Sequence, residues 1–79
     1  MKVKVKLFGT LGQDFTGYDS LKGLDVDMPD DARVKDLLAH LDIPETSGIM
    51  VIMDNTIAKP MDTLINGATI KIFQALAGG

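Results

Sequence analysis

The chain opens with a strict alternation of polar and apolar residues. Residues 2–8 read Lys-Val-Lys-Val-Lys-Leu-Phe, so the valines and Leu7 are expected to point to one side and the lysines and Phe8 to the other. This pattern predicts a strand with one buried face. Glycines then interrupt the pattern, and we expect a long loop over residues 9–20. A second alternation over residues 24–28 predicts another strand.

One helix is predicted in the middle of the chain. Apolar residues recur at the i, i+3, i+4 and i+7 positions from Val34 to Leu41, and this spacing places them on a single stripe. Asp30 and Asp31 lie just before the stripe, where carboxylates favour a helix N-terminus, so we expect them to cap it. Pro44 is expected to end the helix.

The C-terminal third predicts strands and turns. Residues 49–53 form a continuous apolar run, which favours a central strand buried on both faces, and residues 56–58 predict a short return strand. The Asn66-Gly67 pair predicts a turn, and residues 68–73 alternate as a last strand. This order of elements predicts an α+β fold, with one main helix on one face of a mixed four- to five-stranded sheet.

Composition narrows the class of protein. The 79 residues are 46% hydrophobic and 24% charged, which is typical of a single folded domain over residues 1–79. The net charge of −3 disfavours nucleic acid as the main partner, because phosphate binding needs a positive face. Cysteine is absent, which excludes disulfides, thiolate metal sites and a cysteine nucleophile. No apolar run reaches the length of a membrane helix, so we expect a cytoplasmic protein.

No residue constellation indicates catalysis or metal binding. The single histidine, His40, lies in the predicted helix without a second histidine nearby in sequence. Four acidic residues gather before the helix, and a solvated face with a helix cap explains them more simply than a cation site: Asp25, Asp27, Asp30 and Asp31. We therefore predict no catalytic residue and no metal ligand.

The positions of two phenylalanines indicate a docking surface. Strand parity places Phe8 on the lysine face of the first strand, and places Lys71 and Phe73 on one face of the last strand. If these strands are neighbours, the three side chains share an exposed surface of the kind that binds protein partners. In the alternative, Phe8 folds over a loop and Phe73 is covered by Phe15 or Tyr18.

The end of the sequence offers one reactive group. Ala77-Gly78-Gly79 follows the last strand, and the terminal carboxylate becomes reactive when it is joined to AMP as a mixed anhydride. Glycine lacks a Cβ atom, so such a segment can pass through a narrow channel. We expect a flexible tail over residues 74–79. A frayed glycine terminus without a function is the alternative.

The whole chain resembles the ubiquitin-like sulfur carrier proteins of the MoaD/ThiS family, which comprise the small subunit of molybdopterin synthase and the thiamin-pathway sulfur carrier. The resemblance rests on the opening strand at residues 4–8, the helix segment at 34–38 and the turn at 64–67. Above all it rests on the ending Phe-Gln-Ala-Leu-Ala-Gly-Gly at residues 73–79. It implies the β-grasp fold.

The resemblance also implies an activity. A ubiquitin-activating-type enzyme would use ATP to adenylate the carboxylate of Gly79, a sulfur donor would convert it to a thiocarboxylate, and the sulfur would pass to an acceptor in cofactor biosynthesis. The chain would then be a co-substrate or small subunit rather than an enzyme, with no permanently bound cofactor. Leu76, Ala77 and Gly78 would enter the active sites of the partners.

The partners implied are the adenylating enzyme and a sulfur-accepting synthase subunit, with the free chain a monomer. Family partners dock on the sheet face near the tail, a location that Phe8, Phe73 and Leu76 match. We expect Phe8, Lys71 and Phe73 to bind the partner. The ending is similar to thiamin-type carriers and the opening strand to molybdopterin-type carriers, so thiazole synthase and the molybdopterin synthase large subunit both stay open as acceptors. Two alternatives are a ubiquitin-like modifier joined through Gly79 to lysines and a passive binding module.

Overall fold

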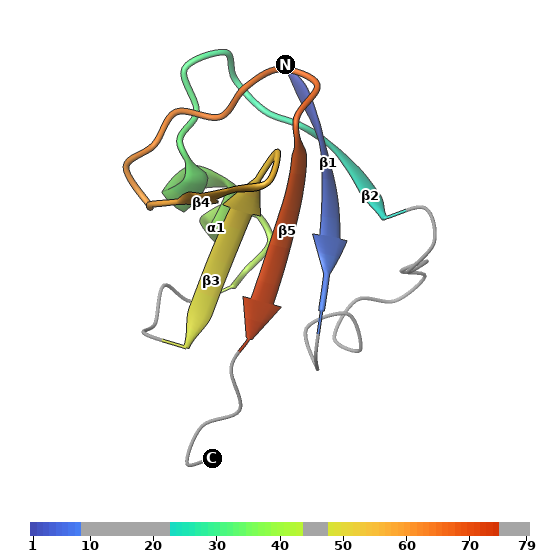
Figure 1. Ribbon diagram of the computed structural model, residues 1–79. Helices are drawn as coiled ribbons and strands as arrows, with labels where there is room; N and C mark the ends of the chain where they lie inside the picture. Colours follow the sequence, from blue (N-terminus) through green and yellow to red (C-terminus); the bar gives the residue numbers. More distant parts are fainter. Residues whose placement is uncertain (9–22, 44–47, 75–79) are drawn as a thin grey trace.

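The computed structural model describes residues 1–8, 23–43 and 48–74, and the account below concerns these residues. Its elements follow the predicted order: β1 (Lys2–Leu7), β2 (Leu24–Asp27), α1 (Val34–His40), β3 (Ile49–Met53), β4 (Thr56–Ala58) and β5 (Thr69–Gln74). The strands form one mixed sheet in the order β2-β1-β5-β3-β4, in which the β1–β5 pair is parallel and the other pairs are antiparallel. Helix α1 packs on one face of this sheet (Figure 1).

The core lies between α1 and the covered face of the sheet. Alternate residues of the two central strands point into it, as the period-two pattern predicts, and Val5 and Ile70 are both fully buried. From the helix, Val34 and Leu37 are fully buried and complete the apolar stripe. No polar or charged side chain of the described residues is buried.

The N-terminus of α1 is capped differently from the prediction. The backbone N–H of Arg33 donates to Asp36 Oδ2 at 2.8 Å, so the carboxylate that caps the helix comes from its first turn. The N–H groups of Val34 and Lys35 donate to backbone carbonyls of residues 62 and 60, each at 2.9 Å. These partners already satisfy the first N–H donors of the helix. The prediction that Asp30 and Asp31 cap the helix is therefore wrong.

The C-terminus of α1 is closed by a Schellman motif. The N–H of Ile43 donates to the carbonyl of Leu38 at 2.9 Å, and the N–H of Asp42 donates to the carbonyl of Ala39 at 3.1 Å. Asp42 adopts the left-handed conformation, with φ of 58°. The last helical residue is therefore His40, and a local hydrogen-bond pattern ends the helix before the proline that was predicted to do so.

Strand β3 is not buried on both faces, so that prediction is wrong. Val51 is its only buried residue, and Met50 is 48% exposed. The physical reason is that α1 covers one face of the sheet only, so residues of β3 on the other face are left uncovered. The short return strand β4 is confirmed, and it follows a two-residue turn in which Asp54 and Asn55 both have positive φ.

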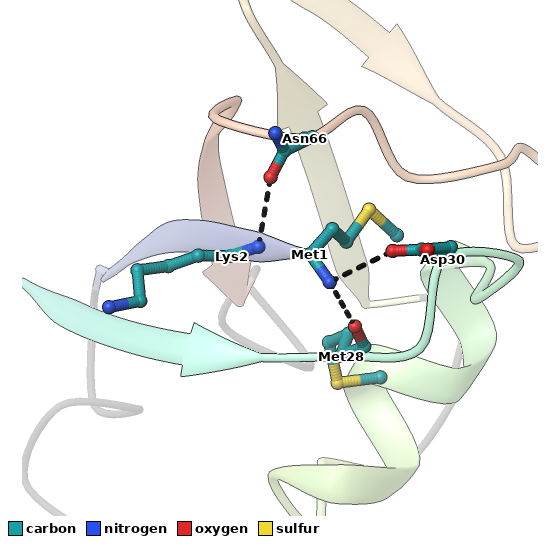
Figure 2. Close-up of polar contacts among 5 residues, drawn as sticks. All are labelled: Met1, Lys2, Met28, Asp30 and Asn66. Carbon is teal, nitrogen blue, oxygen red and sulfur yellow. Dashed lines mark hydrogen bonds and ion pairs between the residues drawn. The ribbon is translucent and has the colours of Figure 1, made fainter.

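The start of β1 is held by contacts to two distant segments (Figure 2). The ammonium group of Met1 donates to the carbonyl of Met28 at 2.6 Å and forms an ion pair with Asp30 Oδ1 at 3.1 Å. The N–H of Lys2 donates to Asn66 Oδ1 at 3.0 Å, so the predicted Asn-Gly turn is confirmed and also fixes the first strand. Within the residues that the structure covers, no helix is long and apolar enough to cross a membrane.

Candidate docking surface

The candidate site lies where β1 and β5 end side by side. The two strands are parallel neighbours with Lys6 opposite Lys71 and Leu7 opposite Ile72. The N–H of Phe8 donates to the carbonyl of Ile72 at 2.9 Å, so the pairing continues one residue past β1. Parallel strands end at the same edge of a sheet, and residue 74, where β5 ends, lies at this edge (Figure 1).

The two phenylalanines stack on each other. Their ring centroids are 4.5 Å apart and the ring planes differ by 11°. Phe8 is 37% exposed and Phe73 is half-buried, and both belong to the face of the sheet that α1 leaves open. The predicted juxtaposition of the two rings is therefore confirmed. Phe15 and Tyr18, which the alternative invoked as covers, lie outside the described residues.

The exposed apolar surface extends from this stack onto β3 and β4. Met50 lies opposite Phe73 in the antiparallel register, and Ile52 lies between Lys71 on one side and Ile57 on the other. Ile57 is 68% exposed. We call the apolar members of this surface the open-face patch: Phe8, Met50, Ile52, Ile57 and Phe73.

The β3 and β4 members of the open-face patch were not predicted from the sequence. If residues 49–53 form a strand buried on both faces, Met50 and Ile52 are not expected on an open surface. The available signal was the apolar spacing from Val34 to Leu41, which predicts a single helix. One helix can cover only one face of a five-stranded sheet, so every strand must leave alternate residues uncovered.

The tail residues with the predicted chemistry lie outside the described residues. Leu76, Ala77, Gly78 and Gly79 are among them. The structure places Gln74 as the last residue of β5, where the sequence analysis began the tail. What the structure shows is therefore the surface beside which the chain continues towards residue 79.

The remaining candidates of the sequence analysis do not meet at a site. His40 is exposed at the end of α1. Asp25 forms an ion pair with Lys4 at 3.9 Å, and Asp30 pairs with the ammonium of Met1. In the parts of the chain covered by the structure, no three histidine, aspartate or glutamate side chains gather in a way that could hold a metal ion.

Comparison with known proteins extends these observations. The family model described as ThiS family matches residues 5–79. SAMP1 from Haloferax volcanii has a similar structure, with a TM-score of 0.80 at 22% identity over 100% of both chains. A putative molybdopterin converting factor, subunit 1, from Pyrococcus furiosus is also similar, with a TM-score of 0.73 at 19% identity over 95% of this chain and 98% of that chain.

Urm1 from Trypanosoma brucei is also similar, with a TM-score of 0.63 at 20% identity over 99% of this chain and 95% of that chain. No curated protein sequence matches the chain. The structural likenesses establish the fold as the β-grasp, with a five-stranded mixed sheet and one helix. The family match covers nearly the whole sequence, and the chain therefore belongs to the ThiS family of ubiquitin-like proteins.

Proposed function

We propose that this protein is a sulfur carrier whose cargo is held at the carboxyl group of Gly79. In the first step the carboxylate attacks the α-phosphate of ATP in the site of an adenylating enzyme, and pyrophosphate leaves. In the second step a sulfide-equivalent nucleophile adds to the activated carbonyl and displaces AMP. The chain then ends in a thiocarboxylate, which can donate its sulfur to an acceptor.

The observation that carries this proposal is the match to the ThiS family, which runs through Gly79. The open-face patch supports it by its location, because it adjoins the strand end from which the chain continues to the tail. A partner that binds this patch would have the tail within reach of its active site. Glycines at 78 and 79 present no side chain to the walls of such a site.

Each predicted site residue has a place in this proposal. Phe8, Lys71 and Phe73 dock the partner, and the segment from Leu76 to Gly78 enters its active site. The protein acts as a co-substrate rather than an enzyme and needs no permanently bound cofactor, because the partner uses the ATP. We place the reaction in the cytoplasm, where ATP is available, and the free chain is a monomer.

The acceptor of the sulfur is a synthase subunit of cofactor biosynthesis. The family match favours the thiamin branch, with thiazole synthase as the acceptor. The likeness to a molybdopterin converting factor subunit favours the large subunit of molybdopterin synthase. Both acceptors require the same thiocarboxylate, so the first test concerns the carrier itself.

A second candidate function uses the same activated carboxylate. The chain is similar in structure to a protein described as small archaeal modifier protein 1 from H. volcanii, with a TM-score of 0.78 at 20% identity. If a lysine amine rather than sulfide displaces AMP, the product is an amide between Gly79 and another protein. The two functions then differ only in the nucleophile.

Intact-mass spectrometry tests both functions. The protein is incubated with the adenylating enzyme from the same genome, ATP and sulfide, and we expect one oxygen to be replaced by sulfur. A variant that lacks Gly78 and Gly79 is the control and should keep its mass. Amide-linked adducts in a lysate that disappear with Gly79 would instead identify a modifier. If the enzyme adenylates another carrier protein but the mass of this protein stays unchanged, the sulfur-carrier function is contradicted.

A further inference from the structure

The lysines on the open face of the sheet are of two kinds, those opposite a carboxylate and those opposite another lysine. On β1, Lys2 lies opposite Asp27 and Lys4 lies opposite Asp25, so each faces a carboxylate on β2. The Lys4 Nζ to Asp25 Oδ1 distance is 3.9 Å. The next outward-facing residue of β1 is Lys6, and it lies opposite Lys71 of β5 rather than opposite an acid.

Among the described residues, a glycine rather than an acid lies beside Lys6 on its other side. Strand β2 begins at Leu24, opposite Val5, and the residue before it is Gly23. A Cβ atom on Gly23 would lie 2.7 Å from the carbonyl oxygen of Val5 and 3.2 Å from Lys6 Cγ. Because that space is closed, no carboxylate side chain fits at this position without moving the backbone.

We expect the lysine pair to be unfavourable for the folded chain alone, because the two residues are paired in the register of β1 and β5. Like charges directly opposite each other on neighbouring strands destabilise a sheet, and Lys6 and Lys71 are both half-buried. Neither takes part in the ion pairs found among residues 1–8, 23–43 and 48–74. Ile52, on the far side of Lys71, supplies no counter-charge. A local conflict of this kind, retained beside exposed apolar residues, is typical of a functional surface.

We propose that Lys6 and Lys71 form one cationic site within the open-face patch, and that this site selects a partner with carboxylates beside an apolar docking pocket. The inference rests on the proposed function, and the partner it describes is the adenylating enzyme. When the enzyme covers Phe8 and Phe73, water leaves the neighbourhood of the two ammonium groups. Their attraction to carboxylates then strengthens, because the local dielectric constant falls.

The surroundings of the two lysines favour protein carboxylates over phosphate groups. Half-buried Ile52 lies opposite Lys71, and beyond it the patch continues with Met50 at 48% and Ile57 at 68% exposure, which suits a complementary protein surface. The chain as a whole carries a net charge of −3, which repels polyanions at longer range. Two adjacent cations in an acidic protein therefore act as a local selector of partner surfaces.

Charge reversal tests this role against a matched control. The variants are Lys6→Glu, Lys71→Glu and Lys35→Glu, which change the net charge equally, and Lys35 lies on α1, which packs on the other face of the sheet. The measurement is kcat/KM for pyrophosphate release by the adenylating enzyme, at low and at moderate salt. We expect a loss of about tenfold or more for the first two variants and less than about twofold for Lys35→Glu. Added salt should lower the wild-type value and leave Lys71→Glu nearly unchanged.

Urea unfolding of the same variants supplies a second readout. Lys71→Glu replaces repulsion with attraction to Lys6, so its unfolding midpoint should rise while its kcat/KM falls. A fall in the midpoint would overturn the proposal, because the lysine would then be a structural residue. Wild-type kcat/KM and salt dependence in Lys71→Glu would overturn this inference alone. Failure of the enzyme to adenylate the wild-type chain would overturn the proposed function and the inference together.

Discussion

Phe8 and Phe73 show how far single residues can be interpreted from strand parity. The alternating pattern placed each ring on a definite face, and the parallel pairing of β1 with β5 brought the rings to 4.5 Å. Parity cannot state which strands are neighbours, so the stacking itself was not available from the sequence. Nor could it reveal Met50 or Ile57, whose exposure depends on which face the helix covers.

Substitution of Phe8 separates docking from stability. Because Phe8 is 37% exposed, we expect Phe8→Ala to lower the free energy of unfolding by only about 1 kcal/mol, the scale of a stacked aromatic pair. It should weaken binding of the adenylating enzyme by up to about 2 kcal/mol if the ring is a hot spot. Urea unfolding and titration with the enzyme measure the two effects. Ile65→Ala, which removes an exposed apolar side chain outside the patch, is the control for binding. A large stability loss in Phe8→Ala would show that the ring belongs to the core.

Two glycines with similar φ angles allow strain and crowding to be separated. Gly23 and Gly67 have φ of 72° and 82°, but only at Gly23 would a Cβ atom meet the backbone, 2.7 Å from the oxygen of Val5. Gly67→Ala should cost about 1 kcal/mol for the left-handed conformation alone. Gly23→Ala should cost about 1–3 kcal/mol more, because the backbone must also move. Equal urea midpoints for the two variants would contradict this assignment.

At the scale of elements, the N-terminal cap of α1 is where the structure differs most clearly from the prediction. Asp36 accepts the N–H of Arg33 at 2.8 Å, whereas Asp31 is exposed just before the helix. We expect Asp36→Ala to lower the free energy of unfolding by about 0.5–2 kcal/mol, the usual value of a capping bond. Asp31→Ala should leave stability nearly unchanged. Thermal or urea unfolding of the two variants measures these effects. A larger stability loss in Asp31→Ala than in Asp36→Ala would support the cap predicted from the sequence.

The apolar stripe of α1 makes a prediction of larger size. Leu37 is fully buried between the helix and the sheet, so Leu37→Ala should cost about 2–5 kcal/mol. Lys35→Ala, on the exposed side of the same helix, should change stability little. Urea unfolding again provides the measurement. A cost for Leu37→Ala below that of Phe8→Ala would place the core elsewhere.

The order of elements could be predicted because each one has a local signature. Alternation marked β1 and β2, spacing marked α1, and the Asn66-Gly67 pair marked the turn before β5. The environment of β3 could not be predicted, because an apolar run of five residues fits a fully buried strand and a strand beside an edge equally well. The end of α1 could not be predicted from the apolar spacing either, because it depends on the left-handed conformation of Asp42.

At the scale of the whole molecule, the core is small, so each core substitution removes a large fraction of the free energy of unfolding. A typical stability of about 0.05–0.15 kcal/mol per residue gives a 79-residue chain about 4–12 kcal/mol. The expected cost of Leu37→Ala is a large part of that range, so this variant tests the integrity of the fold. The surface substitutions Lys6→Glu and Lys71→Glu leave the core intact and are suited to test function.

The candidate site was predicted in part at this scale. The tail chemistry came from the resemblance of residues 73–79, and the docking surface came from the positions of Phe8, Lys71 and Phe73. The lysine pair was not predicted, because it arises from the register between the first and last strands and from Gly23 beside them. Such pairs become visible only when strand neighbours are known.

The parallel pairing of β1 with β5 also has a consequence for biosynthesis. The strand at the start of the chain can complete its hydrogen bonds only after residue 72 has emerged from the ribosome, since its partner strand β5 is made last. Until then one hydrogen-bonding edge of β1 is unpaired, and an unpaired strand edge favours aggregation of nascent chains. Completion of the sheet and assembly of the Phe8–Phe73 surface are therefore a single late event, so partners meet only chains whose synthesis has passed the last strand.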